Sequence, residues 1–109
     1  MNEQDFAEKA DAMLAQIEAA LEGLQQRDEL DFDFELKPGG VLELEFDPGG
    51  KIIVNRHGAA REIWLAARSG GFHFRYDDGR WCDTRSGDDL LQSLARCISE
   101  QAGVAVSLG

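Results

Sequence analysis

Residues 51 to 81 read KIIVNRHGAAREIWLAARSGGFHFRYDDGRW, with the run Ile63-Trp64-Leu65-Ala66 near the centre. Successive side chains of a β-strand point to opposite faces, so Ile63 and Leu65 would share one face and Trp64 would occupy the other. If the first face is the core, Trp64 meets solvent. A large exposed aromatic side chain is a candidate anchor for a binding partner. The alternative is that a terminal segment covers Trp64, since Trp is also common in buried positions.

Short runs of alternating apolar and polar residues extend on both sides of this stretch, and clusters of Gly, Pro and Asp separate them. Such a pattern predicts half-buried strands joined by tight turns. We expect six strands: Leu30–Leu36, Val41–Phe46, Lys51–Asn55, Arg61–Ala67, Phe72–Tyr76 and Arg80–Asp83. Sequential strands joined by short turns pair as one antiparallel meander.

Strand parity places two polar residues on the same open face as Trp64. Asn55 points outward because its neighbours in the strand alternate toward the core, and His73 points outward because it lies between two phenylalanines. His57 falls in the predicted loop 56–60, where a lone surface histidine more often has no specific role. Trp81 ends a strand near a helix, so we interpret it as a packing residue.

Two amphipathic helices flank the predicted strands. The first begins after Asn2, a good N-cap with Asp5 in the capping-box position. Its apolar side chains recur at helical spacing and are Phe6, Ala10, Met13, Leu14, Ile17, Leu21 and Leu24. In the second helix Ser86 and Asp89 repeat the capping arrangement, and Gly103 follows its end. The sequence therefore predicts an α+β fold, a two-layer sandwich with both helices on one face of an antiparallel six-stranded sheet.

The composition is that of one small globular domain, residues 1–109, with 43% hydrophobic and 29% charged residues. The N-terminus lacks the positive start and apolar run of a secretory signal, and no window approaches the ~18 apolar residues of a membrane span. We therefore expect a cytoplasmic protein. Cys82 and Cys97 match neither a CxxC pair nor a zinc spacing. Both are predicted to be reduced packing residues.

The negative charge is concentrated in the first half of the chain. The net charge is −10, and residues 1–47 hold 14 Asp and Glu against 3 Lys and Arg, whereas residues 48–109 hold 7 against 8. A strongly acidic protein repels phosphate groups, which makes nucleic acids and anionic membranes poor partners. Cations or a basic protein are better ones.

The acidic side chains line one face of a strand and one side of the first helix. Asp31, Asp33 and Glu35 alternate with apolar residues along the predicted strand, and Glu18 and Glu22 lie opposite the apolar stripe of the helix. Closely spaced carboxylates suit hard cations, which relieve their mutual repulsion. The alternative is a solvated face that keeps the protein soluble.

Several motifs in this order resemble the frataxin family, over essentially the whole chain. They are the acidic first helix and strand, Ile52-Ile53-Val54-Asn55-Arg56, Ile63-Trp64-Leu65-Ala66, Gly70-Gly71-Phe72-His73-Phe74, Trp81, and Asp83-Thr84-Arg85-Ser86-Gly87. The resemblance implies a small protein that binds iron weakly and modulates iron–sulfur cluster assembly. It also implies contact with a cysteine desulfurase and its scaffold partner. We expect a monomer.

The resemblance assigns site residues as well. The candidates for an iron-binding acidic ridge are Glu18, Glu22, Asp28, Glu29, Asp31, Asp33 and Glu35, and those for the partner-binding sheet face are Asn55, Trp64 and His73. Two departures from the family stand out. The helix carries single acids where adjacent pairs are frequent, which shifts the expected iron affinity toward Asp31 and Asp33, and His57 stands where a Gln is common.

Enzymatic activity finds no support in the residues. The chain contains no nucleophile–base arrangement, glycine-rich phosphate loop or paired-carboxylate cleft. We therefore expect a non-enzymatic regulator that docks to the desulfurase. The alternative is an iron-storing or ferroxidase-type protein that oligomerises with iron, and a plain acidic interaction module remains if iron does not bind.

Overall fold

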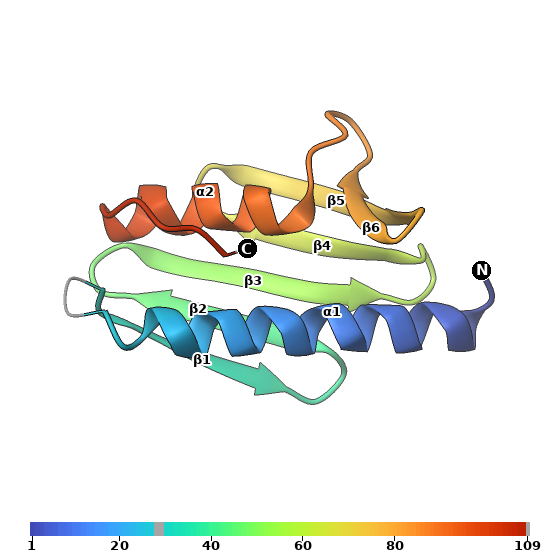
Figure 1. The fold of residues 1–109 in the computed structure, drawn as a ribbon, viewed down its shortest axis with the longest axis horizontal. Helices are drawn as coiled ribbons and strands as arrows, with labels where there is room; N and C mark the ends of the chain where they lie inside the picture. The colour runs from blue at the N-terminus through green and yellow to red at the C-terminus, as the bar shows by residue number, and fades with distance from the viewer. Residues whose placement is uncertain (28–29, 109) are drawn as a thin grey trace.

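The computed structural model describes residues 1–27 and 30–108. The elements are, in chain order, α1 (Glu3–Leu24), β1 (Phe32–Lys37), β2 (Val41–Phe46), β3 (Gly50–His57), β4 (Glu62–Ala67), β5 (Gly70–Asp77), β6 (Arg80–Asp83) and α2 (Leu90–Ala102). Both helices cover the same face of the sheet, with their axes along the strands (Figure 1). The predicted two-layer α+β sandwich is confirmed.

The sheet is an antiparallel meander in the order β1-β2-β3-β4-β5-β6, so β1 and β6 form its edges. β1 begins later than predicted because the Leu30 N–H donates to the Arg27 carbonyl, a turn bond in place of a strand pair. β3 runs further than predicted, to His57. The register places Trp64 of β4 between Asn55 of β3 and His73 of β5.

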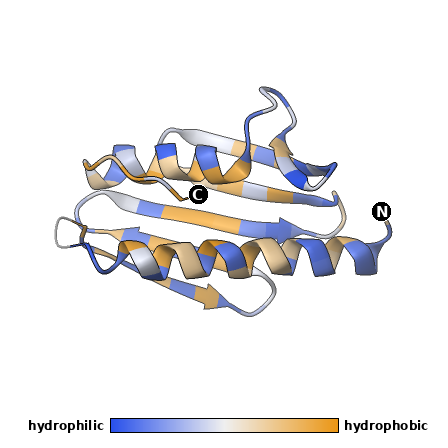
Figure 2. Cartoon of the chain, viewed as in Figure 1, coloured by the Kyte–Doolittle hydropathy of each residue, from blue (hydrophilic) through white to orange (hydrophobic). Residues whose placement is uncertain are grey.

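Helix α1 buries one stripe against the sheet and exposes the other. Asn2 caps it as predicted, since its side chain accepts a hydrogen bond from the Asp5 N–H at 2.8 Å. The fully buried side chains Phe6, Leu14 and Leu21 follow the predicted helical spacing. Apolar and polar residues accordingly alternate along the helix in Figure 2.

The N-cap of helix α2 lies three residues after the predicted cap. Asp89 is the N-cap and accepts hydrogen bonds from the N–H groups of Leu91 and Gln92, so the prediction of Ser86 as the cap was wrong. Ser86 instead accepts a bond from the Asp88 N–H inside the preceding turn. Gly103 ends the helix with φ 74°, a conformation that glycine adopts without steric cost.

Trp81 lies in the core, as predicted, and is 1% exposed. Its ring meets Phe6 of α1 edge-on, with centroids 5.9 Å apart, and Tyr76 of β5 at 5.4 Å. These contacts join the N-terminal turns of α1 to the β6 edge of the sheet. Cys97 of α2 is also buried as predicted, and burial raises the pKa of its thiol.

The buried side chain of Gln101 ties α2 to both turns at one end of the sheet. Its amide nitrogen donates to the carbonyls of Gly49 and Lys51, and its oxygen accepts from the Arg68 N–H. A Cβ at Gly49 would lie 2.2 Å from the Gln101 carbonyl oxygen, so only glycine fits there. These bonds fix the helical layer over β3 and β4, whose opposite side carries Trp64.

The C-terminal segment lies on the helical layer. Leu108 is buried, the Val106 N–H donates to Ser99 of α2, and the Ala105 carbonyl accepts from Arg27. Residues 105–108 therefore lie beside the helices and away from the other face of the sheet (Figure 1). Among the described residues, no helix is long and apolar enough to cross a membrane.

Candidate docking face and acidic ridge

Trp64 is the middle of three stacked rings on the sheet face that the helices leave open. The His57 imidazole lies 3.9 Å from the indole, centroid to centroid, at an interplanar angle of 14°. His73 lies 4.4 Å away at 8°. The His57, Trp64 and His73 rings, called the ring stack below, come from β3, β4 and β5. Within residues 1–27 and 30–108, no terminal segment covers Trp64, but the imidazoles cover both faces of its ring.

His57 was predicted to lie in a loop, and this prediction was wrong. The residue pairs with Glu62 in the ladder between β3 and β4, one step beyond the Asn55–Trp64 pair. Its Nδ1 also accepts a hydrogen bond from the Ala60 N–H at 3.3 Å, which holds the turn that follows. Its parity matches that of Asn55, so a longer predicted strand would have placed it beside Trp64.

Sequence reasoning also missed Glu62, which supports the ring stack. This glutamate is only 6% exposed although it lies on the open face, two residues before Trp64. Its carboxylate accepts hydrogen bonds from the Trp64 indole N–H and from Arg75 Nε, each at 2.8 Å. Burial by itself would raise the pKa of Glu62, but these two bonds and the Arg75 charge outweigh it and lower the pKa. Glu62 is therefore ionised at neutral pH.

The structure brings the three predicted partner-binding residues together. Asn55 is half-buried opposite Trp64 in the register, and its amide donates to the Arg56 carbonyl. His73 is half-exposed at the other side of Trp64. Asn55, Trp64 and His73 thus form a row across three neighbouring strands. Their role in binding stays a prediction.

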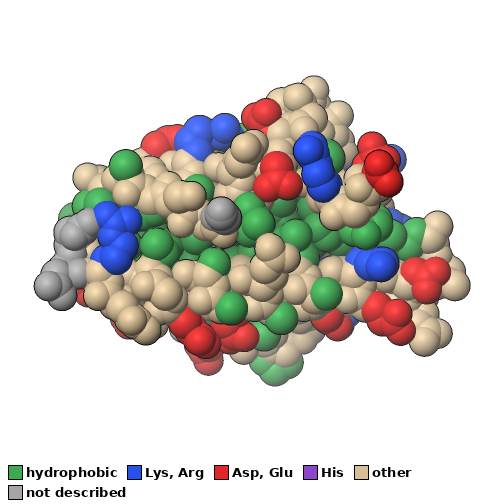
Figure 3. All heavy atoms as spheres, viewed as in Figure 1, with side chains coloured by type: hydrophobic (Ala, Val, Ile, Leu, Met, Phe, Trp, Pro, Cys, Tyr) green, Lys and Arg blue, Asp and Glu red, His purple; other side chains and the backbone are tan. Residues whose placement is uncertain are grey.

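The acidic candidates divide between the two faces of the β1 edge. Asp33 and Glu35 are exposed on β1, on the face opposite the core-packed phenylalanines of that strand. Glu18 and Glu22 lie on α1, which covers the other face. Asp31 is exposed just before β1, while Asp28 and Glu29 lie outside the described residues. In Figure 3, acidic side chains gather along the lower edge of α1, next to β1.

Strand pairing adds two acids that the sequence analysis did not single out. Glu45 lies opposite Asp33, and Glu43 lies opposite Glu35. Like charges directly opposite one another are destabilising, and Glu43 is relieved by Lys37 and Lys51, at 2.9 and 3.2 Å. Hydrogen bonds from these two lysines lower the pKa of Glu43.

The remaining carboxylates of this face, Asp33, Glu35 and Glu45, take part in none of the ion pairs found among residues 1–27 and 30–108. They have the oxygen chemistry that hard cations prefer. No group of three or more Asp, Glu, His or Cys in the described part of the chain is arranged to hold a metal ion. The carboxylates that are described therefore fit a weak surface association with a cation.

Cys82 lies on the open face, because it alternates with the buried Trp81. It is half-buried, and Arg80 Nη2 approaches its sulfur to 3.6 Å. Arg75 is its cross-strand partner. The prediction of Cys82 as a plain packing residue was therefore wrong, since two basic residues border it at the β6 edge.

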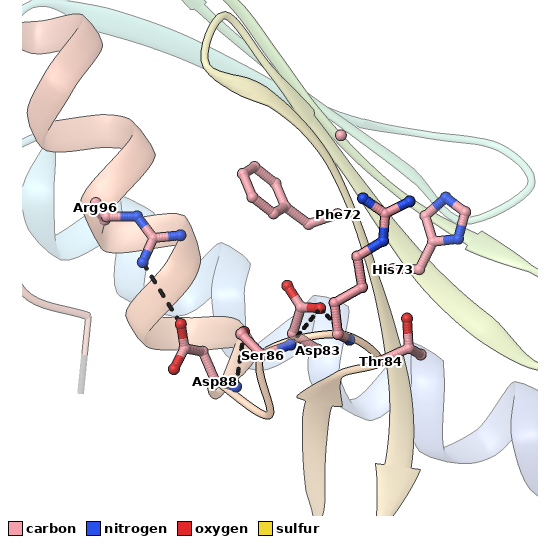
Figure 4. Close-up of a pocket in the computed structure, with 9 residues that line it drawn as sticks. Phe72, His73, Asp83, Thr84, Ser86, Asp88 and Arg96 are labelled. Atoms are coloured by element: carbon pink, nitrogen blue, oxygen red, sulfur yellow. Dashed lines mark hydrogen bonds and ion pairs between the residues drawn. The ribbon is translucent and has the colours of Figure 1, made fainter.

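A hollow of mixed charge adjoins the ring stack between β5, the loop after β6, and α2 (Figure 4). It is lined by Gly71, Phe72, His73, Asp83, Thr84, Arg85, Ser86, Asp88 and Arg96. Asp83 accepts hydrogen bonds from the N–H groups of Arg85 and Ser86, and Asp88 pairs with Arg96 at 3.8 Å. The two aspartates and two arginines balance, so this hollow has no dominant charge.

Comparison with known proteins finds close relatives over the full chain. The family model described as a frataxin-like domain matches residues 1–104. The iron–sulfur cluster assembly protein CyaY of Dechloromonas aromatica is 52% identical, over 99% of this chain and 99% of its own length. The protein of the same name from Ralstonia nicotianae is 50% identical, over 99% of this chain and 95% of its own.

Solved structures agree with this match. The frataxin of Psychromonas ingrahamii has a TM-score of 0.86 at 34% identity, covering 100% of this chain and 99% of that one. A trimeric frataxin from the yeast Saccharomyces cerevisiae, complexed with ferrous, has a TM-score of 0.76 at 29% identity, over 87% of this chain and 86% of that one. The same two-layer fold thus recurs in relatives that share 34% and 29% of their sequence with this chain.

Proposed function

Because the chain belongs to the frataxin family, we propose that it takes part in iron–sulfur cluster assembly as a non-enzymatic, iron-binding regulator. It acts in the cytoplasm by docking to the cysteine desulfurase and its scaffold partner. The observation that carries the docking proposal is the ring stack on the open sheet face. An aromatic anchor held in place before binding is typical of the residues that dominate interface energetics.

The charge distribution supports the same proposal. Acidic side chains on β1 and β2 border the open face, and Trp64 lies further across it on β4. A basic partner surface would meet the acidic side first, by electrostatic steering, and the ring stack would then make short-range contacts. Association should therefore weaken as salt concentration rises.

Iron association is proposed for the acidic ridge. Asp33, Glu35 and Glu45 supply carboxylates on one face that belong to none of the ion pairs found among the described residues, and Glu18 and Glu22 lie across the β1 edge. These groups attract and hold a hydrated cation, whereas a buried cage would be needed for tight binding. Weak binding suits a protein that responds to the iron level without retaining the metal.

The test of the proposed function is a desulfurase assay with the scaffold present, run with and without this protein and with and without iron. We expect the rate of cysteine desulfuration to change only when protein and iron are both added. The salt dependence of the effect provides a control, because a change through docking weakens at high ionic strength. A rate that stays the same in every combination would contradict the proposal.

Titration with ferrous iron is expected to broaden the backbone NMR signals of residues 18–35 first, since a paramagnetic ion relaxes the nuclei near its ligands. The double variant Asp33→Asn, Glu35→Gln should remove the broadening at β1. As a matched control, Asp77→Asn with Asp78→Asn removes two acids from the end of β5 and the turn that follows it. Broadening confined to His57 and His73 would contradict the ridge assignment.

Iron storage is a second candidate, favoured by the trimeric state of the yeast relative that is complexed with ferrous. An iron-storage protein and a regulator differ in their oxygen uptake and in their size when iron is added. A storage protein would take up oxygen and grow in size on a sizing column as iron is added. A regulator would stay a monomer under the conditions in which the desulfurase rate changes.

A further inference from the structure

Glu62 is the one charged residue that is buried in the described ranges 1–27 and 30–108, and it lies on the sheet face opposite the helices. A carboxylate is seldom buried without a partner, because leaving water costs several kcal/mol unless hydrogen bonds replace the lost hydration. In this protein the Glu62 carboxylate is surrounded by Trp64, His73 and Arg75, which lie on the same face of the sheet. Glu62 is thus part of the proposed docking surface, beneath its outermost groups.

The two carboxylate oxygens of Glu62 have different partners. Oε1 accepts the Trp64 indole N–H at 2.8 Å and lies 3.4 Å from His73 Nδ1. Oε2 accepts from Arg75 Nε at 2.8 Å. One side chain of β4 therefore orients the indole next to it and the arginine of β5, and the indole in turn lies between the two imidazoles.

We propose that Glu62 is a positioning residue for docking, which holds Trp64 edge-outward in the ring stack and aligns Arg75 beside it. This inference rests on the proposed docking function. Both faces of the indole are covered, so the partner meets the edge of the ring and the rims of the imidazoles. Fixing these groups before contact removes the entropy loss that flexible side chains would suffer on binding.

The chemistry of the position requires a carboxylate. Both close partners, the indole of Trp64 and Nε of Arg75, are hydrogen-bond donors, and Glu62 offers each a separate oxygen. Glutamine has the same size but only one oxygen, and its amide nitrogen would face a donor. Glu62→Gln therefore releases one of the two groups without opening a cavity, and it leaves the charge of Arg75 without its partner.

The decisive experiment measures dissociation from the immobilised desulfurase–scaffold complex together with the indole ¹H–¹⁵N NMR signal of Trp64. In Glu62→Gln we expect the indole signal to shift and its hydrogen to exchange faster. Affinity should fall about 10-fold or more, mainly through faster dissociation, as for loss of a bond to a charged group. Glu100→Gln, an exposed acid on α2, is the matched control and should bind as wild type.

Trp64→Phe provides an independent second variant, because it keeps an aromatic ring in the stack but removes the N–H that Glu62 accepts. Adding Glu62→Gln to it should cost less affinity than Glu62→Gln costs in wild type, since the two residues act through one bond. If Glu62→Gln lowered the affinity equally in wild type and in Trp64→Phe, or did not lower it at all, the positioning role would be overturned while docking stayed intact. No binding by the wild-type protein would overturn docking and positioning together.

Discussion

Replacing Trp64 with arginine is expected to abolish capture of the desulfurase–scaffold complex while the protein stays folded. The substitution removes the central ring of the stack and with it the contacts to His57 and His73. Truncating a central aromatic anchor typically costs 2 kcal/mol or more, which is at least about 30-fold in affinity. The added positive charge next to Arg75 makes the face still less suited to a basic partner.

The fold should tolerate Trp64→Arg because the side chain lies on the open face and the core does not depend on it. Glu62 already accepts a bond from Arg75 and can accept one from a second guanidinium. Capture on beads loaded with the complex measures the effect, with thermal unfolding of each variant as the control for folding. Capture at the wild-type level would exclude Trp64 as the anchor.

Truncation of Trp81 to alanine is expected to have the largest effect on stability. The ring is fully buried against Phe6 and Tyr76, so its loss leaves a cavity between α1 and β6. Such substitutions cost about 3–5 kcal/mol, a large part of the roughly 5–15 kcal/mol that stabilise a small domain. For a domain of this size the melting temperature should fall by about 15–25 °C.

Thermal unfolding followed by far-UV circular dichroism measures this effect, and Trp81→Phe is the conservative control because it restores most of the aromatic packing. Below the melting transition, the folded fraction of Trp81→Ala should still bind the partner, since Trp81 faces the core and not the docking face. A melting temperature close to that of wild type would show that the site repacks around the missing ring.

Local pattern was sufficient to predict the architecture. The stripe ending at Leu24, the cap at Asn2 and the alternation along the strands each depend on residues close in sequence, and the structure confirms all three. Boundaries were less predictable, since they depend on single hydrogen bonds. Arg56 and His57 continue β3 only because Ile63 and Glu62 lie opposite to pair with them.

The candidate sites also contain some residues that the sequence could place and others that only the structure could place. Parity alone placed Trp64, Asn55 and His73 on the open face, and the frataxin resemblance, confirmed by the family match, gave them a proposed role. The acids Glu43 and Glu45 did not stand out in the sequence, because only the pairing of β1 with β2 brings them opposite Glu35 and Asp33. This register depends on two strands and cannot be read from either strand alone.

The amino-acid sequence by itself determined the two-layer fold and the direction in which Trp64 points, because helical and strand periodicities are properties of one segment at a time. Its motifs indicated the family, which the family match confirmed. Only the tertiary structure decided that Trp64 is stacked between two histidines and held by a buried glutamate. Parity predicts an exposed side chain at Glu62. Its burial arises because the register of β4 and β5 brings the indole and Arg75 within hydrogen-bonding distance of one carboxylate.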